Sequence, residues 1–253
     1  MLQTYLKAEC LKFRRSLFWR LIAWIPSSLI LISGVFVYVG VGLSGFSGVM
    51  VCNWGMPVAS LSVVFLCHLL NGKDKRHQYR TLYSLPVDLR KIFLSKVVLA
   101  GENLLIISLV LSFIMAISEY MSLGARSALP NMVFPILGFF FLWLSVLWQI
   151  PFCLFLDQKI GFVGSVVINL FASAFGGLFF YLTPVFWVFP YSWPGRFMVT
   201  LFGILTNGMP ADKNSRLILS SGEGILLSAI SLMALVVFTA LFSYWQERQV
   251  SRK

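Results

Sequence analysis

Long apolar runs separated by short polar stretches dominate the chain and indicate its fold class. Six runs reach the length of about 20 residues that a helix needs to cross the hydrocarbon of a bilayer. They are Leu21–Val41, Val51–Leu70, Val97–Ser118, Met132–Leu154, Gly161–Leu182 and Gly224–Tyr244. Because helices satisfy their own backbone hydrogen bonds in lipid, we expect an all-α polytopic membrane protein with six transmembrane helices. These helices form one transmembrane domain over residues 1–253.

The composition excludes a soluble globular protein. Of the 253 residues, 58% are hydrophobic and only 11% are charged, whereas soluble domains carry roughly 25% charged residues. The 4 cysteines are far apart and lie in or near apolar runs. Neither a disulfide framework nor a C-x-x-C metal pair is therefore expected.

The basic residues predict which side of the membrane each loop faces. One set of alternating loops, together with both termini, carries Lys7, Lys12, Arg14, Arg15, Arg20, Lys73, Lys75, Arg76, Arg80, Arg90, Lys91, Lys96, Lys159, Arg248, Arg252 and Lys253. The opposite loops carry only Arg126, Arg196, Lys213 and Arg216. Under the positive-inside rule, both termini are cytoplasmic. Because the net charge of +11 follows this topology, we expect the lipid bilayer as a partner and no nucleic acid.

The N-terminal segment, residues 1–20, is predicted to be an amphipathic helix. Apolar side chains recur along it at helical spacing, and its basic residues occupy the other faces. Such a helix lies in the cytoplasmic membrane interface, with its basic residues toward anionic lipid heads. The segment also serves equally well as a simple topology anchor.

The second cytoplasmic loop, residues 71–96, is expected to hold a short helix with an aromatic face. Pro86 pushes its predecessor out of the α region and so ends that helix. Asp88 is then the expected N-cap of the helix that enters the third span. A short basic helix of this kind either docks on a partner or rests on lipid heads. The residues expected to dock are Arg76, Tyr79, Arg80, Leu82 and Tyr83.

The outer loop, residues 183–223, is rich in proline and aromatic residues. Its apolar run Phe197–Thr206 is too short to cross the membrane, so we expect a re-entrant or interfacial helix there. Tyrosine and tryptophan at this depth are more often membrane anchors than ligand contacts. The candidates for contact with a substrate on this side are Trp187, Tyr191, Trp193 and Arg196.

Few polar residues fall inside the predicted spans, among them Glu102, Asn103, Gln149 and Asn169. An ionisable residue at membrane depth is a functional candidate by default. Glu102 lies near the cytoplasmic end of its span, where it could reach Lys96 or a basic loop residue. We favour such a structural ion pair over a proton-coupling role. Pro151 is expected to kink the fourth span.

Several motifs for chemistry are missing from the sequence. It has no G-x-x-x-x-G-K-[ST] loop to cradle nucleotide phosphates and no H-E-x-x-H metal site. An intramembrane hydrolase is therefore not expected, and neither is a bound cofactor. A carrier driven by protons or sodium usually shows more than one intramembrane ionisable group. The pattern favours a membrane passage whose energy comes from another protein.

This arrangement of elements resembles the permeases of ABC-2 type transporters. The string TLYSLPVDLRKIFLSK at Thr81–Lys96 is similar to the pattern that follows the coupling helix of that superfamily. Three further strings, Trp148–Gly161 continued through Asn169, Pro190–Arg196 and Gly203–Pro210, resemble the permease subunits of lantibiotic immunity transporters. Together the similarities span nearly the whole chain.

The resemblance implies a function and a set of partners. Such permeases, in the bacterial plasma membrane, expel lantibiotics (cationic lanthionine-bridged peptides) and so protect the producing cell. Two ABC ATPase subunits would bind ATP and Mg²⁺, and a second permease, related or identical, would complete the complex. The chain itself would not be an enzyme. An ABC-2 permease for a lipid, polysaccharide or drug, and a membrane protein without transport, are the alternatives.

Overall fold

The computed structural model describes residues 2–13, 16–41, 43–76, 88–123, 133–212 and 214–250. Its α-helices are α1 (Leu2–Phe13), α2 (Leu17–Phe36), α3 (Leu43–Asn53), α4 (Ala59–Arg76), α6 (Leu89–Leu123), α8 (Val133–Val146), α9 (Gln149–Leu178), α10 (Trp193–Phe202) and α11 (Ser221–Val250). The π-helical turns are η1 (Val37–Val41) and η2 (Trp54–Val58), and the 3-10 turns are η4 (Phe180–Leu182), η5 (Pro184–Trp187) and η6 (Pro190–Ser192). The predicted all-α class is confirmed for these described ranges.

Within the described residues, five stretches are long and apolar enough to cross a membrane. They are Leu17–Val39, Gly45–Gly72, Leu89–Met121, Gln149–Leu182 and Ser221–Arg248, and a shorter apolar helix covers Phe134–Val146. The five long stretches overlap the first, second, third, fifth and sixth predicted spans. The chain is therefore a multi-pass membrane protein.

The predicted fourth span, Met132–Leu154, is not one continuous helix. A turn at Leu147 and Trp148 divides it between α8 and the start of α9. Pro151 lies in the first turn of α9, where the missing proline N–H leaves no intrahelical hydrogen bond unmade. The break lies three to four residues before the proline, which is where a proline bends a helix, so the expected bend in the fourth span is present.

Helix α9 folds back on itself at Gly161. This residue has φ 80° and ψ −178°, a backbone conformation that essentially only glycine adopts. The Cys153 thiol donates a hydrogen bond to Asn169 Oδ1 at 3.3 Å, although the two residues are 16 positions apart. In a straight helix they would be about 24 Å apart. α9 is therefore a hairpin with a first arm (149–160) and a second arm (162–178).

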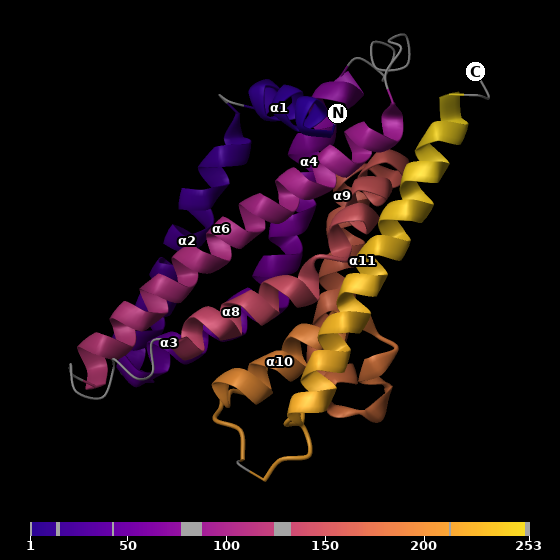
Figure 1. The fold of residues 1–253 in the computed structure, drawn as a ribbon. Coiled ribbons are helices and arrows are strands. Elements are labelled where there is room, and N and C mark those ends of the chain that lie inside the picture. The colour runs from indigo at the N-terminus through magenta and orange to yellow at the C-terminus, as the bar shows by residue number, and fades with distance from the viewer. Residues whose placement is uncertain are drawn as a thin grey trace.

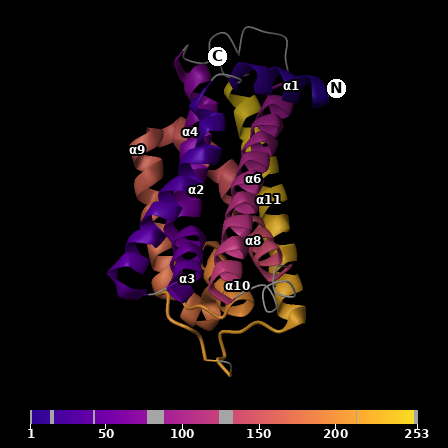
Figure 2. The same cartoon turned by 90° about the vertical axis from the view of Figure 1, so that its left-hand side faces the viewer.

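The long helices run side by side, and both ends of the described chain lie at the same end of this bundle (Figures 1 and 2). α1 lies across that end, where α4 finishes and α6 begins. We call it the basic end, because the lysines and arginines of α1, the end of α4 and the start of α6 gather there. In the middle of the bundle, α4 packs against α9 and α6 against α8.

The N-terminal helix is shorter than predicted. α1 ends at Phe13, whereas the sequence predicts an amphipathic helix over residues 1–20. Ser16 accepts a hydrogen bond from the backbone N–H of Phe18 at 3.2 Å and caps α2, so residues 17–20 already belong to the first apolar helix. The Phe13 and Phe18 rings pack 5.7 Å apart across this junction and are buried.

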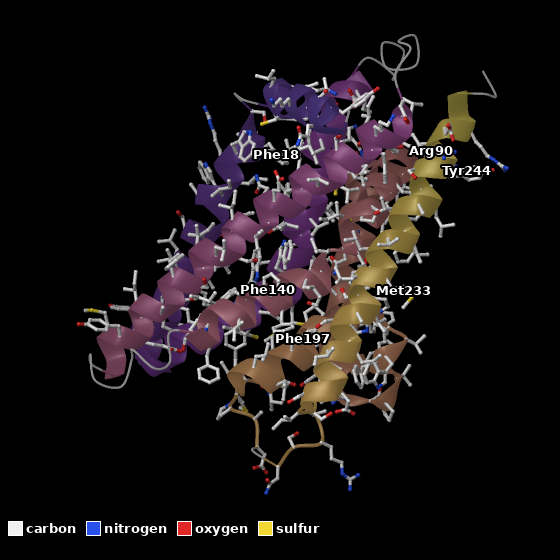
Figure 3. All side chains as sticks on the ribbon, in the orientation of Figure 1. Phe18, Arg90, Phe140, Phe197, Met233 and Tyr244 are labelled. Atoms are coloured by element: carbon white, nitrogen blue, oxygen red, sulfur yellow. The ribbon has the colours of Figure 1, made fainter. Side chains whose placement is uncertain are left out.

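At the opposite end, α10 begins at Trp193 and not at the predicted Phe197. Pro194 lies in its first turn, a position that suits its fixed φ. Gly203, with φ 63°, ends the helix in the left-handed conformation. Residues 193–199 are buried, and the Phe197 ring stacks on Phe141 with centroids 5.5 Å apart (Figure 3 shows Phe197).

Candidate functional site

A buried ion pair joins α4 to α6 at the basic end. Lys96 is 1% exposed, and its Nζ lies 2.6 Å from Asp74 Oδ2. The same ammonium donates to Asn71 Oδ1 at 3.2 Å. A buried charge is tolerated only when it is paired and hydrogen-bonded, and Lys96 meets both conditions. The end of α4 and the start of α6 are thereby fixed to each other.

Helix α1 contributes a second cation to this ion pair. Lys12 Nζ donates to Asp74 Oδ1 and also lies 3.3 Å from Glu9 Oε1. Burial by itself raises the pKa of Asp74, but the charge of Lys96 and the hydrogen bonds from Lys12 and Lys96 outweigh it. The pKa of Asp74 therefore lies below its ordinary value, and its carboxylate holds α1 against the bundle.

Asn71 extends the contacts to the hairpin of α9. Its side-chain amide donates to Asp157 Oδ2 at 3.2 Å and to the Leu154 carbonyl at 3.0 Å. Asp157 is fully buried, and its Oδ1 lies 2.9 Å from His68 Nδ1. Lys75 Nζ donates to the Asp157 carbonyl at 3.3 Å. Two side chains of α4, Asn71 and His68, thus hold this buried carboxylate, and Lys75 holds the backbone carbonyl of the same residue.

These contacts form one continuous series, which we call the polar chain. Its members, in order of contact, are Lys12, Asp74, Lys96, Asn71, Asp157 and His68. It connects α1, α4, α6 and α9 at the basic end. Because the bonds are buried or partly buried, a displacement of one helix end is opposed at the other three.

The polar chain lies where the second cytoplasmic loop begins and ends. Arg76 is the last residue of α4, and Asp88 precedes α6. The Asp88 carboxylate accepts hydrogen bonds from the backbone N–H groups of Arg90 and Lys91 at 3.1 and 3.3 Å, which confirms it as the predicted N-cap. Of the residues predicted to dock, Tyr79, Arg80, Leu82 and Tyr83 lie outside the described residues.

Glu102 does not form the ion pair with Lys96 that the sequence suggests, whereas Asp157, which the sequence analysis did not select, is a buried carboxylate. Glu102 is exposed on the side of α6, and Lys96 pairs with Asp74 instead of with it. Lys96 as the partner of Glu102 is therefore wrong, and one of the other expected partners, the basic loop residue Arg80, lies outside the described residues. Sequence analysis missed Asp157 because the predicted fourth span ends at Leu154. A usable signal was its spacing of four residues from Cys153, which places both on one helix face.

Asn169 and Tyr191, predicted as a membrane residue and an outer-loop residue, meet in the structure. The Tyr191 hydroxyl donates to Asn169 Oδ1 at 2.7 Å, and Asn169 Nδ2 donates to the Ser165 carbonyl at 2.8 Å. Both side chains are buried. Gln149 is also buried, and neither of its amide atoms has a hydrogen-bond partner among the described residues.

The other outer-loop candidates, Trp187, Trp193 and Arg196, pack within the outer segment and stabilise it. Trp193 Nε1 donates to the Phe186 carbonyl at 3.0 Å. The Arg196 guanidinium donates to two backbone carbonyls and lies over the Phe186 ring, 4.0 Å from its centroid. Burial lowers the pKa of Arg196. Trp193 and Arg196 are buried, and Trp187 is partly buried.

An apolar cavity of about 270 Å³ lies between η2 and the second arm of α9. Its walls include Asn53, Met56, Ser173, Gly177 and Thr206. Thr206 comes from the segment at the opposite end, and the Cys52 thiol donates to its carbonyl. Since small-molecule pockets measure roughly 300–1,000 Å³, this cavity suits an apolar side chain better than a whole ligand.

The described residues contain no group of histidine, cysteine, aspartate and glutamate side chains that could hold a metal ion. Comparisons of the chain with protein-family models, with curated proteins and with solved structures find no match. The function must therefore be inferred from two features of the structure. They are the polar chain at one end of the bundle and the apolar cavity deeper within it.

Proposed function

We propose that this chain is the permease subunit of an ABC exporter that expels a lantibiotic from the cell membrane and so protects the producing cell. The polar chain carries the proposal. It links both ends of the predicted docking loop to α1 and α9 through buried bonds. A force on that loop would reach four helices without any nucleotide site in the permease itself.

The proposed topology has six membrane crossings with both termini in the cytoplasm. The crossings are α2, α3 with η2 and α4, α6, α8 with the first arm of α9, the second arm of α9, and α11. An even number of crossings returns the chain to its starting side, in agreement with α1 and the end of α11 lying at the same end (Figure 1). In this topology α10 is the outer re-entrant helix, and its burial supports that role.

Energy would enter through the docking helix predicted at Tyr79–Ser84. That helix would lie in a groove of the ATPase, a helix-in-groove contact. When two ATPase subunits close on ATP, the ends of α4 and α6 move with them, and the polar chain passes the movement to α1 and α9. Two permeases would then switch as rigid bodies between two packed arrangements.

The peptide would enter sideways from the outer leaflet, near α10 and the proline-rich segment. The cavity beside Thr206 supports this entry point, because it lies between a membrane helix and the outer segment. Its apolar lining suits one hydrophobic side chain of the peptide. The rest of the peptide would lie between the two permeases.

The test is to express the chain with its ATPase and partner permease in a strain sensitive to lantibiotics. We expect the ATPase to co-purify and the strain to tolerate more peptide. The double variant Tyr79→Ala, Tyr83→Ala should lose both properties. The matched control Tyr38→Ala, Tyr120→Ala changes two exposed tyrosines elsewhere and should keep both.

Two results would contradict parts of the proposal. If no ATPase co-purifies with the wild-type chain, the protein is not a permease of this class. If the ATPase binds but sensitivity to every lantibiotic tested is unchanged, the substrate is a different one, such as a lipid, polysaccharide or drug.

A further inference from the structure

Polar residues recur every four positions on both arms of the α9 hairpin. The first arm carries Gln149, Cys153 and Asp157, and the second arm carries Ser165, Asn169 and Ser173. A spacing of four residues keeps each row on one face of its helix. All of these residues are buried, although they lie in an apolar stretch suited to crossing a membrane.

The fold at Gly161 brings the two rows face to face. Asp157 and Ser165 are equally distant in sequence from this glycine, and so are Cys153 and Asn169. The hydrogen bond from Cys153 to Asn169 at 3.3 Å shows that the second of these pairs is in contact. We call the two facing rows the polar seam.

Several atoms of the seam have no hydrogen-bond partner among the described residues. They are Ser165 Oγ and both amide atoms of Gln149, and Nε1 of the adjacent Trp148 is in the same condition. Gln149 alone offers two donors and an acceptor with two lone pairs. Polar groups left unpaired in the hydrocarbon region of a membrane are strongly unfavourable. These unpaired atoms, from both arms of the hairpin and the turn before it, therefore point to a bound polar ligand.

The two ends of the seam meet the polar chain and the cavity. At the basic end, Asp157 is bonded to His68, whose side chain is 36% exposed. At the other end, Ser173 lines the cavity of about 270 Å³ together with Asn53 and Thr206. The seam thus connects the polar chain with the cavity through the middle of the hairpin.

We propose that the polar seam binds a file of water molecules that joins the cavity to Asp157. Successive polar residues on one arm are about 6 Å apart along the helix axis. That is too far for a direct hydrogen bond but matches two consecutive hydrogen bonds of about 2.8 Å through one water molecule. Ser165 Oγ and the Gln149 amide supply hydrogen-bonding atoms for such waters. The inference holds whether or not the protein is a transporter.

Hydroxyl-radical footprinting of the full chain in lipid nanodiscs tests the proposal. Radicals form from bound water and oxidise nearby sulfur atoms, and mass spectrometry locates the oxidised residues. We expect Cys153, in the seam, and Met56, in the cavity wall, to be oxidised several-fold more than Met233. Met233 is the control, because it lies on the outer side of α11, facing lipid (Figure 3). Equal oxidation of all three residues would overturn the proposal.

A pair of variants separates bound water from general solvent leakage. The double variant Gln149→Leu, Asn169→Leu should lower Cys153 oxidation to the Met233 level. The control Ser231→Ala removes a buried hydroxyl from α11, outside the seam, and should leave Cys153 oxidation unchanged. If the double variant does not fold, Ser165→Ala makes the same test with a smaller change. Unchanged Cys153 oxidation in a folded seam variant would contradict the water file.

Discussion

At the scale of single residues, burial decides how much an ion pair contributes in this protein. Lys96 and Asp74 are 1% and 7% exposed in their side chains, whereas Arg90 and Glu247 are 52% and 50% exposed. Exposed pairs contribute about 0–1 kcal/mol. Removal of one partner from a buried pair leaves an uncompensated charge and costs about 3–5 kcal/mol. The two pairs therefore offer a matched comparison.

We predict that Asp74→Asn lowers the free energy of unfolding by about 3 kcal/mol, because it leaves the buried Lys96 without its carboxylate. The control Arg90→Gln should change stability by less than about 1 kcal/mol. Denaturant unfolding of the purified chain in detergent measures both values. Equal effects of the two variants would show that Asp74 and Lys96 are not paired in the folded protein.

The same pair predicts a dependence of stability on pH. The folded-state pKa of Asp74 is lowered from its ordinary value of 3.8, so the carboxylate stabilises the fold fully at pH values above 3.8. This stabilisation is lost as the pH falls through the lower, folded-state pKa. The stability difference between the wild type and Asp74→Asn should therefore shrink when unfolding is repeated below pH 3.8.

At the scale of elements, one glycine determines whether α9 is a rod or a hairpin. Gly161 adopts a backbone conformation that is strained for any residue with a Cβ. Gly34, in contrast, has helical geometry and no atom within 4 Å of the position of a Cβ. Gly161 therefore requires the absence of a Cβ, whereas Gly34 does not.

We predict that Gly161→Ala destabilises the fold by about 1–3 kcal/mol, the usual range for strained backbone conformations. Gly34→Ala should leave stability unchanged or raise it by up to about 1 kcal/mol, because alanine favours helix. Thermal unfolding of both variants, followed by the loss of helical circular dichroism, makes the comparison. A stable Gly161→Ala protein would mean that α9 does not fold back at this residue.

The features that could be predicted from the sequence are those that depend on residues close together along the chain. Apolar runs marked five of the long helical stretches, and Asp88 was identified as a cap from the residues around it. The burial of Asp157 was not predictable in this way. It depends on contacts with a distant segment, such as that of Asp157 with His68, and hydropathy along the chain carries no information about these contacts.

At the scale of the whole molecule, the proposed function requires the polar chain and the docking loop to face the cytoplasm. Only there could an ATPase reach residues 77–87. The outer segment, with α10 and the turns before it, must then face outside. The two ends of the bundle therefore make opposite predictions for labelling in intact cells.

We predict that, in a cysteine-free background, Arg80→Cys reacts with a membrane-impermeant maleimide only after the cells are permeabilised. Asn214→Cys, in the described outer segment, should react in intact cells. Labelling of Arg80→Cys from outside would remove the basis for an ATPase partner.

The contacts of the polar chain can form only in a certain order during synthesis of the protein. The ribosome releases α1 and α4 before α6 and α9, so Asp74 has only Lys12 as a cationic partner until Lys96 emerges. Asn71 and His68 cannot form their hydrogen bonds to Asp157 until that residue has been translated. A nascent chain that stops before residue 157 consequently presents unmatched polar groups to the bilayer. In the finished chain the same groups are bonded to Asp157.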